Sequence, residues 1–182
     1  MNTKEMIAAA MFAALTAIFA QISIPLPFSP VPITLQVLAV CLAAAILGSK
    51  LGTLSQLLYV AIGAIGLPVF AAGTSGIQAI IGPRGGYIIG FVLGAFVIGK
   101  IVERKSPPTL PATMAAMLAG VIVIYFAGML QLSVVTGMDL KAAFLAGVAP
   151  FVGMDVIKIA LGSYVAYSVR NILIRQNLLT VR

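Results

Sequence analysis

Long apolar runs alternate with short breaks of glycine, proline and charged residues along the 182 residues of the chain. The breaks leave six runs, at about residues 5–22, 33–48, 52–66, 87–103, 111–132 and 142–169. Runs of this polarity are typical of membrane spans, which satisfy their backbone as helices. The pattern predicts an all-α integral membrane protein with six transmembrane helices in one domain, residues 1–182. The third run is short for a full crossing and is expected to tilt or to lean on the loop after it.

Composition agrees with this class, because 62% of the residues are hydrophobic and only 8% are charged. The net charge of +7 comes from basic residues spread singly between apolar runs, so the lipid bilayer is an expected partner and nucleic acid is not. A single cysteine, Cys41, and the absence of histidine exclude a disulfide and a Cys/His metal site. No metal and no cofactor are expected.

The distribution of lysine and arginine predicts the orientation, because cytoplasmic connections carry the excess of basic residues. With a cytoplasmic N-terminus, the inner set is Lys4, Lys50, Lys100, Arg104, Lys105, Arg170, Arg175 and Arg182, and the outer set is Arg84 and Lys141. We therefore expect a multi-pass protein of the cell membrane with both termini cytoplasmic. The first run lacks a small-x-small cleavage pattern near its end and is expected to be retained as a span.

Asp155 and Lys158 lie in the middle of the last apolar run, where ionisable side chains are costly. At spacing i, i+3 they share one face of a helix. Charges at this depth mark a polar site or pathway, so the pair is the first candidate for ligand binding. The alternative is a structural ion pair that only allows the helix to enter the bilayer.

Two outer connections contain further candidates. The first, S-I-P-L-P-F-S-P-V-P-I-T-L-Q, has four prolines and no charge, which predicts a stiff extended loop. Within it, Phe28 is either a lid over a cavity or an interfacial aromatic anchor. Gln36, at the start of the second span, either binds a ligand or bonds to a neighbouring helix.

The second outer connection, G-L-P-V-F-A-A-G-T-S-G-I-Q-A-I-I-G-P-R-G-G-Y, is apolar and Gly-rich, which predicts a re-entrant or cavity-lining loop. Arg84 is the only arginine on the outer side, and its guanidinium is suited to bidentate binding of a carboxylate. The alternative is a contact with lipid headgroups. Tyr87, which opens the fourth span, carries the same two interpretations.

Small residues recur at four-residue spacing in the first span, where Ala9 and Ala13, and Ala10 and Ala14, form adjacent rows of one helix face. Such rows allow close contact between helices. They either pack within the chain or dock another membrane protein.

Several catalytic motifs are absent from the sequence. Without a G-x-x-x-x-G-K-[ST] phosphate loop, the chain is not expected to hydrolyse ATP itself. H-E-x-x-H and G-x-S-x-G are also missing, and the four acidic residues offer no second intramembrane carboxylate for acid/base chemistry. We expect a binding or transport protein without catalytic residues rather than an enzyme.

Four blocks of the sequence carry a resemblance to a known family. They are P-V-P-I-T-L-Q, G-L-P-V-F, G-P-R-G-G-Y-I-I-G-F and P-F-V-G-M-D-V-I-K, in this order over essentially the whole chain. The chain resembles the BioY family, the biotin-specific substrate-binding components of energy-coupling-factor (ECF) transporters. This resemblance implies a six-helix protein that binds biotin from outside and associates with a membrane-embedded coupling subunit and a pair of cytoplasmic ATPases that drive uptake.

The chemistry of biotin suggests a role for each candidate under this resemblance. Asp155 is expected to accept hydrogen bonds from the ureido N–H groups, and Arg84 and Lys158 to attract or hold the carboxylate. Secondary polar contacts are expected from Gln36 and Thr74. The aromatic side chains expected to cover the apolar bicycle are Phe28, Phe70 and Tyr87.

The chain departs from the family pattern at several positions. Arg84 takes the third place of a block that more often reads G-P-T-G-G-Y or G-P-S-G-G-Y, and Ile88 stands where some members carry a basic residue. We expect Arg84 to replace that charge from a nearby turn. Gly153 and Met154 stand in place of the usual Pro-Gly before the acid, and Thr74 stands where some members have asparagine, which can form more hydrogen bonds.

Two other functions stay open at this point. One is a self-sufficient secondary transporter of a small carboxylate vitamin, in which Asp155 carries a proton and Lys158 is its counter-charge, although no inverted repeat is detectable. The other is a structural subunit of a membrane complex, in which the alanine rows of the first span serve assembly and no small molecule binds.

Overall fold

The computed structural model describes residues 2–104 and 107–176, and most of them are helical. Lys105 and Arg182 of the predicted inner set lie outside the described residues. The elements are, in order, α1 (Thr3–Gln21), β1 (Ser23–Leu26), β2 (Ser29–Thr34), α2 (Gln36–Ala64), the 3-10 turn η1 (Ala71–Gly73), α3 (Ile77–Ile81), α4 (Gly85–Glu103), α5 (Leu110–Thr136), α6 (Leu140–Gly147) and α7 (Ala149–Arg175).

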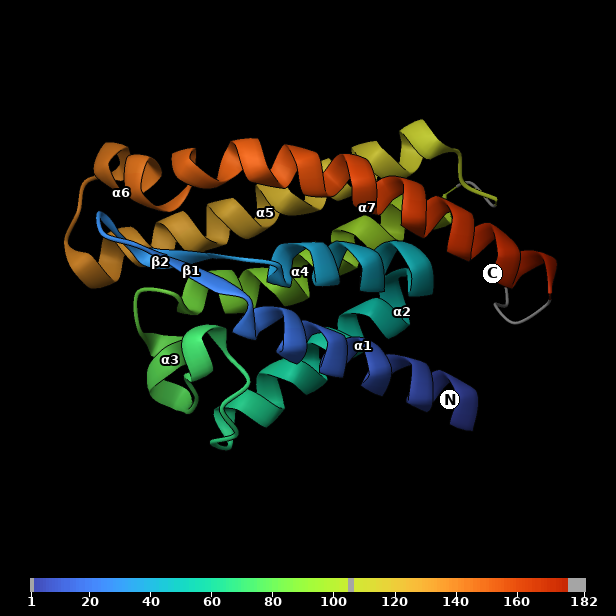
Figure 1. The fold of residues 1–182 in the computed structure, drawn as a ribbon, viewed down its shortest axis with the longest axis horizontal. Coiled ribbons are helices and arrows are strands. Elements are labelled where there is room, and N and C mark those ends of the chain that lie inside the picture. The colour runs from blue at the N-terminus through green and yellow to red at the C-terminus, as the bar shows by residue number, and fades with distance from the viewer. Residues whose placement is uncertain (1, 105–106, 177–182) are drawn as a thin grey trace.

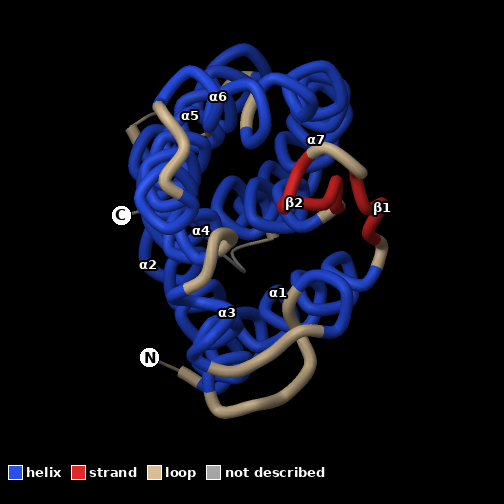
Figure 2. The backbone as a smooth tube through the Cα atoms, turned by 90° about the vertical axis from the view of Figure 1, so that its left-hand side faces the viewer, coloured by secondary structure: helices blue, strands red, loops and turns tan. Residues whose placement is uncertain are grey.

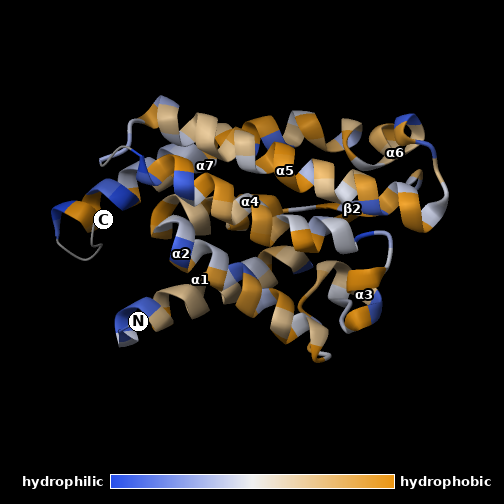
Figure 3. Ribbon diagram, turned by 180° about the vertical axis from the view of Figure 1, so that it is seen from behind, coloured by the Kyte–Doolittle hydropathy of each residue, from blue (hydrophilic) through white to orange (hydrophobic). Residues whose placement is uncertain are grey.

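Five of the described helices, α1, α2, α4, α5 and α7, are long and apolar enough to cross a membrane. They run along the long axis of the molecule, and the start of α1 and the end of α7 lie at the same end (Figure 1). Figure 3 shows hydrophobic residues along these helices and hydrophilic residues mainly towards the two ends. α2 and α4 are the most buried, whereas α1, α5 and α7 expose many large apolar side chains. The helical membrane class is confirmed, and the chain is a multi-pass membrane protein.

The predicted second and third runs fall together in α2, which is not one straight helix. Gly48 has φ 85° and ψ −176°, a conformation open essentially to glycine alone. The ribbon of α2 reverses direction along its length (Figure 1). The two halves then lie against each other, since a Cβ added at Gly52 would come 2.7 Å from the Cα of Ala44. α2 is therefore a helical hairpin.

Two buried polar contacts cap the hairpin where it turns. The carboxylate of Glu103, from α4, accepts hydrogen bonds from the backbone N of Ser49 at 2.7 Å and from its hydroxyl at 2.8 Å. The guanidinium of Arg170, from α7, donates to the carbonyl of Ile46 at 2.7 Å. A negative charge at the start of one half-helix and a positive charge at the end of the other both match the helix dipoles. Arg170 was predicted as an inner basic residue, but it is only 6% exposed and binds the protein itself.

The Pro-rich connection is extended, as predicted, but its two segments also pair. β1 and β2 form an antiparallel two-stranded sheet with an irregularity between Ile24 and Leu26. The hydroxyl of Ser29 donates to the carbonyl of Ala146 at 2.7 Å, which ties the turn of this hairpin to α6. Seen from the end that carries α3 and α6, the strands lie between α7 and α1 (Figure 2). Because Thr34 still belongs to β2, α2 begins at Gln36 rather than near residue 33.

The prediction of a single last helix over 142–169 is wrong. α6 begins after Asp139, whose carboxylate accepts from the N–H of Ala142, and the chain then leaves helical geometry at Val148, with φ −127° and ψ −57°. Pro150, in the first turn of α7, has no N–H to continue a preceding helix. The apolar pattern runs across this break, which is why hydropathy alone merged the two helices.

The two alanine rows of α1 have different environments. Ala9 and Ala13 are each 2% exposed and belong to the buried core of the chain. Ala10 and Ala14 are exposed. The internal-packing interpretation therefore applies to the row of Ala9 and Ala13, which offers no free surface to a partner, and only the other row is open for docking.

Candidate functional site

A cavity of about 330 Å³ lies between the Pro-rich and Gly-rich connections and the helices that follow them. Its wall is formed by β2, the start of α2, the Gly-rich connection, the start of α4, the middle of α5 and the first turns of α7. This volume is within the range of small-molecule sites. Of the predicted residues, the cavity brings together Gln36, Phe70, Thr74, Arg84, Tyr87, Asp155 and Lys158.

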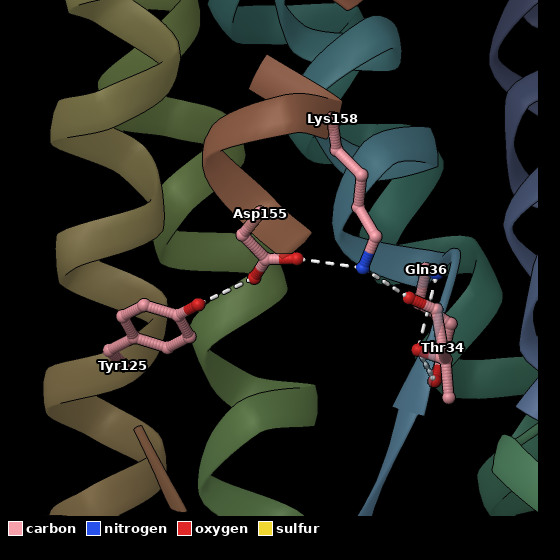
Figure 4. A network of polar contacts seen from close by, with 5 residues as sticks. All are labelled: Thr34, Gln36, Tyr125, Asp155 and Lys158. Atoms are coloured by element: carbon pink, nitrogen blue, oxygen red, sulfur yellow. Dashed lines mark hydrogen bonds and ion pairs between the residues drawn. The ribbon is translucent and has the colours of Figure 1, made fainter. Parts of the chain in front are cut away.

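The acid and the base of α7 form an ion pair at the cavity wall. Lys158 Nζ lies 2.7 Å from Asp155 Oδ1, and the two residues are 7% and 3% exposed. Figure 4 shows that each of the two side chains also has a second hydrogen-bond partner. Lys158 also donates to the carbonyl of Thr34 at 2.7 Å, and the hydroxyl of Tyr125, on α5, donates to Asp155 Oδ2 at 2.6 Å. The pair thus connects three parts of the fold: β2, α5 and α7.

These bonds leave some of the acceptor positions of Asp155 and one donor of Lys158 unused. A carboxylate has about four acceptor sites, of which Lys158 and Tyr125 occupy one on each oxygen of Asp155. An ammonium has three donors, and Lys158 uses two of them on Asp155 and Thr34. The remaining positions can accept two N–H groups and donate one N–H, the complement of a cyclic urea.

Gln36 lies beside this network and is fixed by it. Its Nε2 donates to the hydroxyl of Tyr59 at 2.6 Å, and its Oε1 accepts from the hydroxyl of Thr34 at 3.1 Å. Tyr59 in turn donates to the carbonyl of Val69 at 3.1 Å, which sets the direction of the bond to Gln36. Gln36 therefore bonds to the facing half of α2 and also lines the cavity, and its contact with a ligand stays a prediction.

The Gly-rich connection supplies an aromatic side chain and a polar one. Phe70 is 1% exposed, and its ring packs edge-on against that of Tyr59, with 5.5 Å between centroids. It lies over Gly63, where any Cβ would collide with the ring. The hydroxyl of Thr74 donates to the carbonyl of Ala71 at 2.9 Å, so it presents mainly an acceptor to the cavity.

Arg84 and Tyr87 lie at the entry to α4. Arg84 is the residue immediately before that helix, and its Nη1 is buried without a hydrogen-bond partner among the described residues. An unpaired buried guanidinium nitrogen is costly, so an anionic or carbonyl group of a ligand is the expected partner. The hydroxyl of Tyr87 donates to the carbonyl of Gly147 at 2.7 Å, which leaves its ring to line the cavity.

Phe28 is not among the residues that line the cavity. It lies between β1 and β2 and is 64% exposed. Its position favours the interfacial anchor over a lid in this conformation.

The sequence reasoning missed Tyr125 and the aromatic rings of Phe91 and Phe151, all of which line the cavity. One signal for Tyr125 was present: it is the only polar side chain in the stretch G-V-I-V-I-Y-F-A-G of α5. A hydroxyl at that depth needs a partner, and Asp155 is the carboxylate that lies in the interior of an apolar run rather than at its end.

A bundle of apolar helices around a cavity with buried charges defines the class as a membrane protein that binds a small polar molecule. The sequence profile described as the BioY family matches residues 1–175. The chain belongs to the BioY family.

Individual relatives agree with this assignment. The chain is 43% identical to the biotin transporter BioY of Thermotoga maritima over 169 residues, which cover 93% of this chain and 97% of the relative. It is also 43% identical to the probable biotin transporter BioY of Pyrococcus horikoshii over 166 residues, 91% of this chain and 96% of that one. The crystal structure of an S-component for biotin from an ECF-type ABC transporter matches with a TM-score of 0.87 at 30% identity, covering 93% of this chain and 94% of that chain.

Proposed function

We propose that this chain captures biotin at the outer side of the cell membrane, as the substrate-binding component of an ECF-type transporter. The observation that carries the proposal is the unused hydrogen-bonding capacity around Asp155, in a chain whose relatives are named biotin transporters. The two free acceptor positions of Asp155 match the two ureido N–H groups. The third donor of Lys158 matches the ureido carbonyl.

The rest of the cavity fits the rest of the ligand. Phe70, Tyr87, Phe91 and Phe151 surround the apolar bicycle, with Gln36 and Thr74 as secondary polar contacts. Arg84 binds the carboxylate, because its buried Nη1 has no partner among the described residues. One hydrogen bond to a charged group contributes about 1.5–3 kcal/mol, so nanomolar binding, about 12 kcal/mol, needs several such contacts together with apolar burial.

The proposal includes the arrangement in the membrane. Each half of the α2 hairpin counts as one span, which gives six transmembrane helices with both termini cytoplasmic. The start of α1 and the end of α7 lie at one end of the molecule, which supports one side for both termini, and the excess of lysine and arginine in the connections on that side supports the cytoplasmic one. Uptake is driven by two cytoplasmic ATPase subunits through a membrane-embedded coupling subunit, and the exposed row of Ala10 and Ala14 docks that subunit.

The direct test is biotin binding by the purified chain in detergent, with dethiobiotin and a flavin as competitors. We expect Asp155→Asn and Lys158→Met each to weaken binding by roughly 10- to 150-fold, the equivalent of one charge-assisted hydrogen bond. Lys141→Met, a change of an exposed lysine on α6, is the matched control and should bind like the wild type. Unchanged affinity in both site variants would reduce the pair to a structural role, and no binding by the wild type would favour the structural-subunit alternative.

A further inference from the structure

The Gly-rich connection, residues 65–84, forms one wall of the cavity and is held near both of its ends by a glutamine side chain from another helix. Gln21, at the end of α1, donates to the carbonyls of Pro68 and Phe70, each at 3.4 Å. Gln131, on α5, donates to the carbonyls of Ile80 and Gly82 at 2.7 and 2.9 Å. The bonds of Gln131 are the shorter ones, and they are next to Arg84.

Both N–H groups of the Gln131 amide are used on this connection. The carbonyls it binds belong to the end of α3, where a helix leaves its last C=O groups without partners. Gln131 therefore replaces the bonds that a continued helix would have made. It fixes the backbone at Gly82, two residues before Arg84.

Gln131 also fixes the backbone after Arg84. A Cβ added at Gly86 would come 2.7 Å from the Cβ of Gln131, and one added at Gly85 would collide with its Nε2. Only glycine permits this approach of α5 to the first turn of α4. The side chain of Gln131 thus occupies the space between the segment before Arg84 and the helix after it.

The side chain of Arg84 is itself poorly constrained. Its Nη1 is buried without a partner within residues 2–104 and 107–176, and no ion pair to a carboxylate holds its guanidinium there. A long side chain without its own anchor takes its position from its backbone. The carbonyl of Arg84 accepts from the N–H groups at the start of α4, and the backbone just before Arg84 is held by Gln131 through the carbonyls of Ile80 and Gly82.

We infer that Gln131 is a positioning residue for Arg84 and thereby determines how strongly the site discriminates in favour of a ligand carboxylate. The inference rests on the proposed function, since it assigns the carboxylate of biotin to Arg84. Gln131 does not touch the cavity, and its effect on the ligand is transmitted through the two carbonyls and the two glycines. A bidentate pair between guanidinium and carboxylate is sensitive to geometry, so a small shift of the backbone removes it.

The test compares biotin with biotinamide, which has the same rings but no charged carboxylate, on the purified chain. Gln131→Met keeps the size of the side chain and removes both donors. We expect it to weaken biotin binding about tenfold and biotinamide binding less than about threefold, as Arg84→Gln should. In the double variant Arg84→Gln/Gln131→Met the two effects should not add, because both remove the same contact.

Gln21→Met is the matched control, since it removes the amide that holds the other end of the same connection. That end carries Phe70, which faces the rings, so biotin and biotinamide should lose affinity equally. If Gln131→Met folds poorly, Gln131→Asn is the milder variant, because it keeps the amide but withdraws it by one methylene. It should also weaken biotin binding more than biotinamide binding, by a smaller factor than Gln131→Met.

Equal losses for the two ligands in Gln131→Met or Gln131→Asn, or no loss for either, would overturn the inference and leave Gln131 a structural clamp. The inference is also overturned if the wild type binds biotin and Arg84→Gln loses affinity equally for biotin and biotinamide. That result would mean that Arg84 does not bind the carboxylate. Absence of biotin binding by the wild type is a different outcome, because it refutes the proposed function itself.

Discussion

At the scale of single residues, the buried ion pair of α7 has hydrogen-bond partners far away in the sequence. Asp155 and Lys158 would neutralise each other as a pair, yet each has a second bond, to Tyr125 and to Thr34. Removing one partner of such a network leaves the others unsatisfied in a medium of low polarity, which is costly. The network therefore holds the site in one arrangement before any ligand arrives.

Tyr125→Phe tests the contribution of one such partner. It removes the hydroxyl that orients Asp155 Oδ2 and keeps the ring, so biotin affinity should fall roughly tenfold, about 1.5 kcal/mol. Isothermal titration of the purified chain measures this. Tyr164→Phe, on the same α7 as Asp155 but 64% exposed, should leave the affinity unchanged. Equal affinities for Tyr125→Phe and the wild type would exclude an orienting role.

The sequence made Asp155, Lys158 and Arg84 visible because charge is rare in this chain, and all three line the cavity. Gln131 and Tyr59 could not be found in this way. Their importance comes from carbonyls at Ile80, Gly82 and Val69, and a carbonyl is present at every residue, so no local pattern marks it. Which backbone group lacks a partner is decided only by the fold.

At the scale of elements, hydropathy located the apolar segments and missed one of their breaks. The predicted limits of α1, α4 and α5 agree with the structure within four residues at each end. The predicted break between residues 48 and 52 is present as the reversal of α2 at Gly48, where Gly48, Ser49 and Lys50 interrupt the apolar pattern. The break inside 142–169 was missed because the apolar pattern continues across Val148 while the backbone leaves helical geometry there. The pairing of β1 with β2 was also not predicted, since prolines indicate extended chain but not its partner.

Gly48→Ala should destabilise the fold. The backbone at Gly48 lies in a region that costs other residues about 1–3 kcal/mol, and the added Cβ would collide with the carboxylate of Glu103. We expect a lower thermal unfolding midpoint in detergent. Gly153→Ala is the control, because a Cβ there meets nothing within 4 Å on the helix α7, and it should be neutral or slightly stabilising. The same midpoint for both variants would contradict the hairpin geometry.

At the scale of the whole molecule, the cavity and the exposed row of Ala10 and Ala14 occupy different parts of the protein. The cavity lies among the Pro-rich and Gly-rich connections, whereas Ala10 and Ala14 lie midway along α1, on its free face. α1 is the least buried of the long helices, so a partner can reach it without disturbing the core. Binding and coupling are therefore expected to be separable by mutation.

Ala10→Leu/Ala14→Leu should spare biotin binding and abolish ATP-driven biotin uptake by the assembled transporter, because bulky side chains prevent close helix contact. Uptake is measured with radiolabelled biotin in proteoliposomes that contain the coupling and ATPase subunits. Ala115→Leu, an exposed change on α5, should leave uptake intact. Normal uptake by the double variant would mean that this row faces only lipid.

The first half of the α2 hairpin is short, and under the proposed function its length sets how deep in the membrane biotin would bind. This half, residues 36–47, is about 18 Å long, whereas the hydrocarbon layer is about 30 Å thick. In the proposed orientation the reversal at Gly48 is placed at the cytoplasmic boundary of the hydrocarbon layer. The first residue of α2, Gln36, then lies about 12 Å below the outer boundary of that layer. β2 and the Gly-rich connection form the cavity wall next to the start of α2. Under the proposed function, binding alone would bring the ligand partway across the hydrophobic barrier.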